Sequence, residues 1–344
     1  MTVRPPLRVA IAGAGMISRH HLMAWRAFAP EVDIVAICDP VLERAAARAA
    51  EFGIGFACTS ADALFAGSAF DALDVASPRE THADWVLAAA RRGIAILCQK
   101  PLTPTLAEAE ALLRAIGPAT RLMVHENWRF RPWYRQARRW LEEGAAGDIL
   151  LARMTLLSSF MLPGPTGRSP AFDRQPFMAR ERRLMIAEVL IHQLDVMRFL
   201  CGPLRVVAAR TLRTRPEIAG ETVADILLEM AGGRPVSVVG TMTAPGLPSR
   251  AGDRLEIVGS TASIVFDDWT LCLHGPDRRE IRFDPAAGYQ ESFDAAIGHF
   301  VTALRSATPF ETDAVDNLET LRLVEHAYWA AGQHAPLPAF GEAP

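Results

Sequence analysis

Residues Leu7–Ile17, LRVAIAGAGMI, decide how the first part of this chain folds. The apolar run Leu7–Ala12 has the length of a buried β-strand, and it ends in a loop with Gly13 and Gly15. Such glycines permit a tight turn and let the backbone approach a ligand closely, while the helix that follows offers free N–H groups. Strand, glycine loop and helix in this order are typical of a phosphate-binding loop, but the glycines alone are weak evidence.

A second apolar strand, Val32–Cys38, supports this interpretation because it ends at Asp39, 24 residues after Gly15. Dinucleotide-binding folds place an acidic residue about 20 residues after the glycines, where it accepts hydrogen bonds from ribose hydroxyls. Such a carboxylate would repel a 2′-phosphate, so we expect NAD rather than NADP. Ser18 stands in place of the third glycine, and the alternative for Asp39 is a turn residue before Pro40.

Up to about residue 125 further apolar strands alternate with helical segments, which predicts a parallel sheet covered on both faces. Beyond about residue 200, strand-like runs follow one another without helices between them. We therefore expect an α/β protein with a Rossmann domain over 1–125. The second domain, 126–344, is expected to be α+β with a large open mixed or antiparallel sheet. The C-terminal helical segments Ser292–Ser306 and Ala314–Ala331 have the option of packing back on the first domain.

Composition excludes several classes of protein. Half of the 344 residues are hydrophobic and 22% are charged, enough for the cores of about two domains of roughly 150 residues. The net charge of −3 argues against a nucleic-acid-binding protein. We expect no membrane span, because no apolar stretch reaches about 20 residues. The five scattered cysteines have no metal-ligand spacing, so we expect reduced thiols, a cytoplasmic protein and no metal site.

A single lysine stands out, because the 36 basic residues comprise 35 Arg and Lys100. Base composition explains a general excess of Arg, and a solvated surface lysine is the ordinary alternative. Lys100, however, directly follows the strand Ile94–Cys98 and Gln99, at the edge of the sheet where doubly wound folds bind ligands. Lys is compact and can change its proton state, whereas Arg cannot. We expect Lys100 to contact a substrate hydroxyl and stabilise charge on its oxygen.

A second group of candidate residues lies on an apolar helix predicted over Leu184–Leu200. Glu188, His192 and Asp195 are spaced by four and three residues, which places them on one helix face. His192 can serve as a base near neutral pH with a carboxylate to orient it. A buried histidine with an ion partner, serving only structure, explains the spacing equally well.

The chain resembles the glucose–fructose oxidoreductase / inositol dehydrogenase / rhizopine catabolism (Gfo/Idh/MocA) family over nearly its whole length. Each motif is weak alone, but together they are specific. They are Gly13–Gly15 with Asp39, Ser77–His82 (SPRETH), Gln99–Pro101 (QKP), Asn127–Pro132 (NWRFRP), the helix with Glu188, His192 and Asp195, and Leu318–Ala331.

The resemblance implies an oxidoreductase that oxidises a sugar or polyol with NAD(P) and forms homodimers or homotetramers through its C-terminal sheet. Implied catalytic residues are Lys100, His192 and Glu188. Implied cofactor-binding residues are Gly13, Gly15, Met16, Ile17, Asp39, Ser77, Pro78, His82, Gln99, Lys100, Asn127, Trp128 and Arg129. Implied substrate-binding residues are Lys100, Arg129, Phe160, Glu188 and His192.

Two residues depart from the family pattern. Gln99 stands where the family has Glu beside the lysine, and Glu188 stands where it has Asp. The first change removes a negative charge beside Lys100, and the second lengthens a catalytic side chain by one methylene. The arginine-rich loop Pro163–Arg183 is expected to border the substrate pocket, where its charges either favour an acidic sugar or are merely solvated.

The expected reaction is oxidation of the anomeric hydroxyl of an aldose to a lactone. The run His125–Phe130 suggests relatives acting on aldoses, with D-apiose as a candidate. An inositol or polyol dehydrogenase is the alternative in the same class. An NAD-dependent glycosidase, which would recycle bound NAD, and a non-catalytic NAD-binding sensor are alternatives of other classes.

Overall fold

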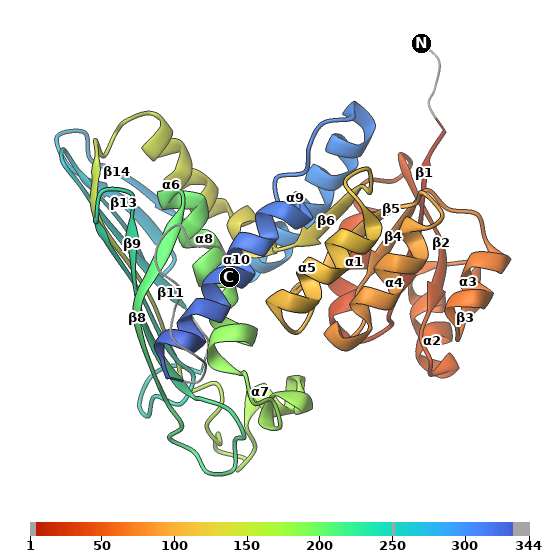
Figure 1. The fold of residues 1–344 in the computed structure, drawn as a ribbon, viewed down its shortest axis with the longest axis horizontal. Helices are drawn as coiled ribbons and strands as arrows, with labels where there is room; N and C mark the ends of the chain where they lie inside the picture. The colour runs from red at the N-terminus through yellow and green to blue at the C-terminus, as the bar shows by residue number, and fades with distance from the viewer. Residues whose placement is uncertain (1–4, 250–251, 333–344) are drawn as a thin grey trace. The chain divides into compact units, whose positions relative to one another are not determined.

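The computed structural model describes residues 5–249 and 252–332. The chain divides into two compact units, each continuous in space but not in sequence (Figure 1). The first unit comprises Met1–Phe130 and Tyr289–Glu319, and the second comprises Arg131–Gly288 and Thr320–Pro344. The sequence predicted a boundary at residue 125 and left open where the C-terminal helices belong.

The first unit contains a six-stranded parallel sheet, as predicted for a Rossmann domain. The strand order is β3-β2-β1-β4-β5-β6, so the connection reverses direction between β1 and β4. Ligands bind at such a reversal, outside the carboxyl ends of the strands. The strands are β1 (Leu7–Ala12), β2 (Val32–Cys38), β3 (Phe56–Cys58), β4 (Ala72–Val75), β5 (Ala95–Gln99) and β6 (Leu122–His125).

Helices cover the strands of this sheet in the way that its apolar residues require (Figure 1). They are α1 (Met16–Arg26), α2 (Leu42–Phe52), α3 (Ala61–Gly67), α4 (His82–Ala90), α5 (Leu106–Ile116) and most of α9 (Pro285–Ser306). Residues of α9 such as Phe293 and Phe300 are buried in one core with Ile11 of β1 and Trp25 of α1. The polypeptide therefore completes the core of its first unit with a segment almost 300 residues from the N-terminus.

The second unit contains an eight-stranded mixed sheet in the order β14-β13-β12-β11-β7-β10-β9-β8. Only β7 and β10 pair in parallel, and the other neighbours are antiparallel. The predicted large open sheet is thus confirmed as mixed. Its strands are β7 (Ile149–Leu157), β8 (Leu204–Leu212), β9 (Val223–Met230), β10 (Pro235–Thr241), β11 (Asp253–Gly259), β12 (Ser263–Asp267), β13 (Thr270–His274) and β14 (Arg279–Arg282).

Two helices, α6 (Pro132–Glu142) and α8 (Ile191–Cys201), pack on one face of this mixed sheet (Figure 1). The sequence predicted one α-helix over Leu184–Leu200, and its first part is different. Met185–Leu190 form a π-helical segment that leads into α8. Helix α10 (Ala314–Ala330) begins in the first unit and ends in the second.

Some short elements were not predicted. Strand β3 has only three residues and helix α3 only seven, too few for periodicity to stand out. The predicted loop Pro163–Arg183 contains a short helix, α7 (Pro170–Arg174), and a 3₁₀ turn, Pro176–Ala179. Among the described residues, no helix is long and apolar enough to span a membrane.

Candidate active site

The glycine loop between β1 and α1 has two glycines with different requirements. Gly13 has φ +107°, and a Cβ there would lie 2.5 Å from the carbonyl oxygen of Ala76. The fold itself therefore requires glycine at this position. A Cβ on Gly15 would meet no atom within 4 Å, and among the described residues no side chain caps the N-terminus of α1. Open space over Gly15 and uncapped N–H groups from Met16 onward fit a dinucleotide pyrophosphate.

Asp39 lies at the end of β2 and is tied to this loop. Its Oδ2 accepts a hydrogen bond from the N–H of Ala14 at 2.9 Å, and its Oδ1 accepts one from Val41 at 2.9 Å. A carboxylate has about four lone-pair positions, so both oxygens can still accept a hydroxyl. Asp39 thus shapes the turn before Pro40 and remains able to bind a ribose.

The segment after β4 carries Ser77, Pro78 and His82. Ser77 Oγ lies 2.7 Å from Thr81 Oγ1. The ring nitrogens of buried His82 lie 2.8 Å from the carbonyl oxygen of Pro101 and 3.0 Å from that of Ser77. Burial lowers the pKa of His82, although these carbonyl contacts oppose the shift. His82 therefore links the loops that follow β4 and β5.

Lys100 follows the last residue of β5, at the carboxyl edge of the parallel sheet. Its backbone N–H donates a hydrogen bond of 2.6 Å to Oε1 of Gln99. Gln99 is buried, and Lys100 is half-buried. The sole lysine thus has a backbone that its neighbour fixes and a side chain at the ligand-binding edge of the sheet.

Gln99 and His125 are the last residues of β5 and β6 and pair with each other. Lys100 and Glu126 directly follow them, so these two residues lie side by side. The Glu126 side chain is fully buried. Burial raises its pKa to about 7, against the opposing effect of the positive charges of Lys100 and Arg129; the carboxylate of Asp316 adds to the rise. A carboxyl group with this pKa can hold or release a proton near neutral pH.

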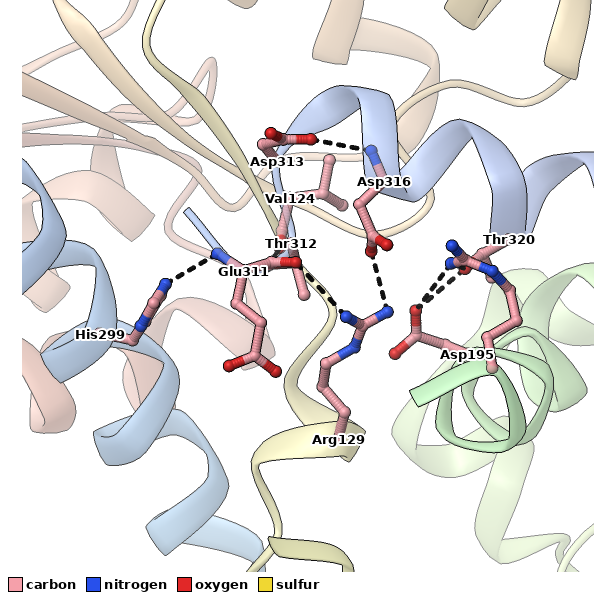
Figure 2. Close-up of polar contacts among 10 residues, drawn as sticks. Val124, Arg129, Asp195, His299, Glu311, Thr312, Asp313, Asp316 and Thr320 are labelled. Carbon is pink, nitrogen blue, oxygen red and sulfur yellow. Dashed lines mark hydrogen bonds and ion pairs between the residues drawn. The ribbon is translucent and has the colours of Figure 1, made fainter. Parts of the chain in front are cut away.

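The residues after Glu126 connect β6 to the C-terminal part of the first unit. Asn127 donates from Nδ2 to Ser292 Oγ at 2.7 Å, and the ring of Trp128 lies edge-on to that of Tyr289. Buried Arg129 donates to Asp316 Oδ2 at 2.9 Å, as Figure 2 shows. These three residues were predicted to bind the cofactor, and their visible contacts hold this edge of the first unit together.

In the second unit, Glu188 lies in the π-helical segment, whereas His192 and Asp195 lie in α8. Between 185 and 197 only Glu188 is not buried, and His192 is 8% exposed. Asp195 is fully buried and accepts a hydrogen bond of 2.9 Å from Thr320 Oγ1 (Figure 2). Isolated π-helical turns occur often at functional sites, because the extra residue redirects a side chain. The shared helix face of Glu188, His192 and Asp195 stays a prediction.

Two family models match this chain. "Oxidoreductase family, NAD-binding Rossmann fold" matches residues 7–125, and "GFO/IDH/MocA C-terminal domain" matches residues 134–265. The chain belongs to the Gfo/Idh/MocA oxidoreductase family. The predicted resemblance is confirmed, and with it an NAD-binding Rossmann domain in an oxidoreductase.

Similar proteins within the Gfo/Idh/MocA family include D-apiose dehydrogenases and inositol 2-dehydrogenases. D-apiose dehydrogenase of Paraburkholderia graminis is 35% identical over 94% of this chain and 87% of its own length. D-apiose dehydrogenase of Rhizobium rhizogenes is 32% identical over 94% and 95%. An Agrobacterium radiobacter oxidoreductase, solved in complex with NAD⁺, L-tartaric acid and magnesium, has 31% identity and a TM-score of 0.87, with 95% and 96% of the chains covered. Family and relatives support a sugar or polyol dehydrogenase.

The sequence analysis did not identify Glu221, which hydrogen-bonds to the start of the π-helical segment that leads into α8. Glu221 is buried, and its carboxylate accepts hydrogen bonds from the N–H groups of Leu184 and Ile186 at 3.3 and 3.1 Å. Tyr328 donates its hydroxyl to Glu221 at 2.5 Å and accepts from Ala187. The carboxylate satisfies N–H groups at the start of the π-helical segment, which are unpaired in any helix. No local pattern signals this role, since Glu221 lies far from the helix in sequence.

Glu126 was missed as well, although a signal for it exists. Like Lys100 it lies one residue past a buried parallel strand, and polar residues at that position gather at the ligand-binding edge.

The remaining predicted substrate residue, Phe160, is half-buried and anchors the arginine-rich loop through its backbone. Its carbonyl oxygen accepts a hydrogen bond from the N–H of Ala171 at 3.0 Å. Within that loop Arg168 pairs with Asp173 and Arg183 with Glu325. Over residues 5–249 and 252–332, no group of three or more His, Cys, Asp or Glu could hold a metal ion.

Proposed function

We propose that this protein oxidises the anomeric hydroxyl of an aldose with NAD⁺ to give a lactone, with D-apiose as the first candidate. The observation that carries the proposal is identity of 35% and 32% to two D-apiose dehydrogenases, each over 94% of the chain. The place of Lys100 at the carboxyl edge of the sheet supports the proposal, because an ammonium group can stabilise the charge that such an oxidation develops on oxygen. An inositol or another polyol is the alternative substrate.

Bound NAD⁺ supplies the two-electron acceptor of this reaction. The proposed role of Lys100 is to donate a hydrogen bond from Nζ to the reacting oxygen, which lowers the energy of the charge that develops there. His192, in the second unit, takes the hydroxyl proton on an imidazole nitrogen. Glu188 orients substrate or base from the π-helical segment. Glu126, when ionised, balances the positive charge of its neighbour Lys100.

We propose NAD rather than NADP as the cofactor. Gly13, Gly15 and the N-terminus of α1 would hold the pyrophosphate, and Asp39 would accept the ribose hydroxyls while repelling a 2′-phosphate. The further predicted contacts of Ile17, Ser77, Pro78 and Trp128 with the cofactor belong to the same proposal.

We also propose a homodimer or homotetramer that forms through the mixed sheet. The face opposite the buried one carries Leu151 and Leu157 on β7 and Leu227 on β9, each at least 40% exposed. Exposed apolar side chains on a sheet face favour a contact with a second copy. Light scattering tests this, because Leu227→Glu would then lower the molar mass to that of the monomer. The cytoplasmic location expected from the scattered cysteines stays a prediction.

The experiment that tests the proposed reaction is a screen for NADH absorbance with aldoses, inositols and sugar acids, run in parallel with NADP⁺. D-apiose is expected to give NADH in proportion to the sugar oxidised. A stronger response to an inositol would favour the polyol alternative, and one to a sugar acid would assign a role to the arginine-rich loop. Glycoside cleavage without net NADH would identify a glycosidase, and NAD⁺ binding without turnover a sensor. Preference for NADP⁺ would overturn the argument from Asp39.

A further inference from the structure

A buried carboxylate and a buried imidazole lie within the first unit, apart from the residues given roles above. Asp74 is on β4 and His21 on α1, and neither side chain is exposed. Asp74 Oδ2 accepts a hydrogen bond of 2.6 Å from Trp25 Nε1, and His21 Nδ1 lies 2.9 Å from the same oxygen. Burying a carboxylate in a sheet opposes folding, and apolar residues of similar volume would avoid the cost.

The contacts of these two residues continue to the backbone of Lys100. His21 Nε2 lies 3.1 Å from Nε2 of Gln99, and Oε1 of Gln99 accepts from the Lys100 N–H at 2.6 Å. A backbone N–H can only donate, so the atom of Gln99 that faces it must be oxygen. The Gln99 amide nitrogen therefore faces His21 and must donate.

This direction determines the state of the imidazole. Because Gln99 donates to it, Nε2 of His21 must accept and carries no proton. The single proton of the neutral ring is then on Nδ1, where it is donated to Asp74. Each hydrogen bond in the series Trp25, Asp74, His21, Gln99 and Lys100 thus has a defined donor and acceptor. The carboxylate of Asp74 can only accept, and this fixes the direction of the bonds at its end of the series.

The same logic explains why an amide rather than a carboxyl group stands at position 99. A carboxylate there would accept from Lys100 but could not donate to His21. The hydrogen bond between a glutamate at position 99 and Nε2 of His21 would need one additional proton, either on the carboxyl group or on the imidazole. With the Lys100 N–H as donor on one side and Nε2 of His21 as acceptor on the other, an amide is the side chain that satisfies both neighbours.

We propose that His21 and Asp74 are positioning residues, which act through the amide of Gln99 to hold the backbone of Lys100 and so direct its ammonium group to the substrate oxygen. The effect of His21 and Asp74 on turnover rests on the proposed function, whereas the position of the proton on the His21 ring does not. Two further rings face His21 from neighbouring elements. The ring of His125 on β6 lies 4.3 Å away and that of Phe293 on α9 5.4 Å away.

One more titratable group lies close to this set. Cys98 on β5 is fully buried, and burial together with the charge of Asp74 raises the pKa of its thiol well above the ordinary value. The thiol therefore stays neutral and adds no competing charge near Asp74.

The first test reads the protons directly, in full-length protein labelled with ¹⁵N-histidine and without any substrate. The ring of His21 is identified by its nuclear Overhauser effects to the Trp25 indole. Between pH 6 and 8 we expect a proton on Nδ1 and none on Nε2 in the wild type. In Gln99→Glu we expect a new one-proton step in the ¹⁵N shifts of this ring. A proton on Nε2 in the wild type, or no new step in the variant, would overturn the proposal.

The second test measures what this arrangement does for Lys100. Asp74→Asn is expected to lower kcat about 10- to 100-fold, as expected for a misplaced reacting group, while NAD⁺ affinity stays unchanged. It is also expected to change the rate at which an amine reagent modifies Lys100, the only lysine. The matched control is Asp71→Asn. Asp71 lies just before the same strand, and its carboxylate accepts only from the Arg8 N–H among the hydrogen bonds resolved for it.

The outcomes separate this proposal from the proposed function. If the wild type oxidises no sugar but His21 shows the expected tautomer, the proposed function fails while the proton positions hold. Equal kcat and equal labelling of Lys100 in Asp74→Asn, Asp71→Asn and the wild type would overturn the positioning role. If Asp74→Asn does not fold, the Gln99→Glu variant tests the positioning role instead. That role requires kcat of Gln99→Glu to change over the same pH range in which the ring of His21 shows its new one-proton step.

Discussion

Replacing Glu126 by Gln removes a buried carboxyl group and keeps its size and one of its oxygens. In the folded protein burial raises the pKa of this group to about 7, from an ordinary value of 4.5. The folded state therefore binds the proton more tightly than the unfolded state does. Stability from this proton is fully present below pH 4.5 and is lost as the pH rises through about 7.

The size of the effect follows from the two pKa values. A difference between 4.5 and about 7, at roughly 1.4 kcal/mol per pKa unit, amounts to about 3 kcal/mol. No discount for solvent screening applies, because Glu126 is fully buried. Most of this loss falls between pH 5 and pH 8. A glutamine has no proton to lose, so the variant lacks this part of the pH dependence.

The assay is urea unfolding followed by tryptophan fluorescence at a series of pH values without NAD⁺. A separate unfolding curve with NAD⁺ identifies the transition of the first unit, because bound NAD⁺ shifts that transition to a higher urea concentration. From pH 5 to pH 8 the free energy of unfolding of Glu126→Gln is expected to rise by about 2–3 kcal/mol relative to the wild type. Glu43→Gln, an exposed carboxyl on α2, serves as control and should follow the wild type. Parallel curves for Glu126→Gln and the wild type would refute the reasoning.

Four further predictions concern other residues. Lys100→Arg keeps the charge but is expected to lose most of kcat, while an amine reagent should inactivate the wild type unless NAD⁺ and substrate protect it. Glu221→Ala leaves buried N–H groups and the Tyr328 hydroxyl without their acceptor, so thermal unfolding should report a loss of about 3 kcal/mol and Tyr328→Phe a smaller one. Gly15→Val should fold like the wild type but bind NAD⁺ weakly in a calorimetric titration, because the protein's own packing tolerates a side chain there. Since the pKa of His82 is lowered, the folded protein should lose stability as the pH falls below about 6.5, and His82→Gln should reduce that loss in urea unfolding.

The periodic part of the fold could be predicted from the sequence. The apolar run Leu7–Ala12 with its glycines, and the strand ending at Asp39, follow rules that act over a few residues. The same rules missed Met185–Leu190, because π-helical bonding changes the spacing of a helix without changing its apolar composition. They also left open the place of Tyr289–Glu319, which is decided by burial of phenylalanines in a core formed early in the chain.

The candidate site likewise has residues that the sequence predicted and contacts that it did not. Lys100 and Asp39 were found because they lie at strand ends, where position alone predicts exposure to a ligand. The link from Asp74 to His21 joins residues 53 positions apart, and neither shows its partner in the local sequence. Such contacts depend on how strands and helices pack, so they become visible only in three dimensions.

The central claim is tested most directly by following NADH absorbance when wild-type protein is mixed with NAD⁺ and D-apiose. We predict one NADH for each sugar oxidised and a lactone as the first product. Lys100→Arg, measured in parallel, should give little NADH. Absence of NADH with D-apiose and every other aldose or polyol, in protein that binds NAD⁺, would contradict the account.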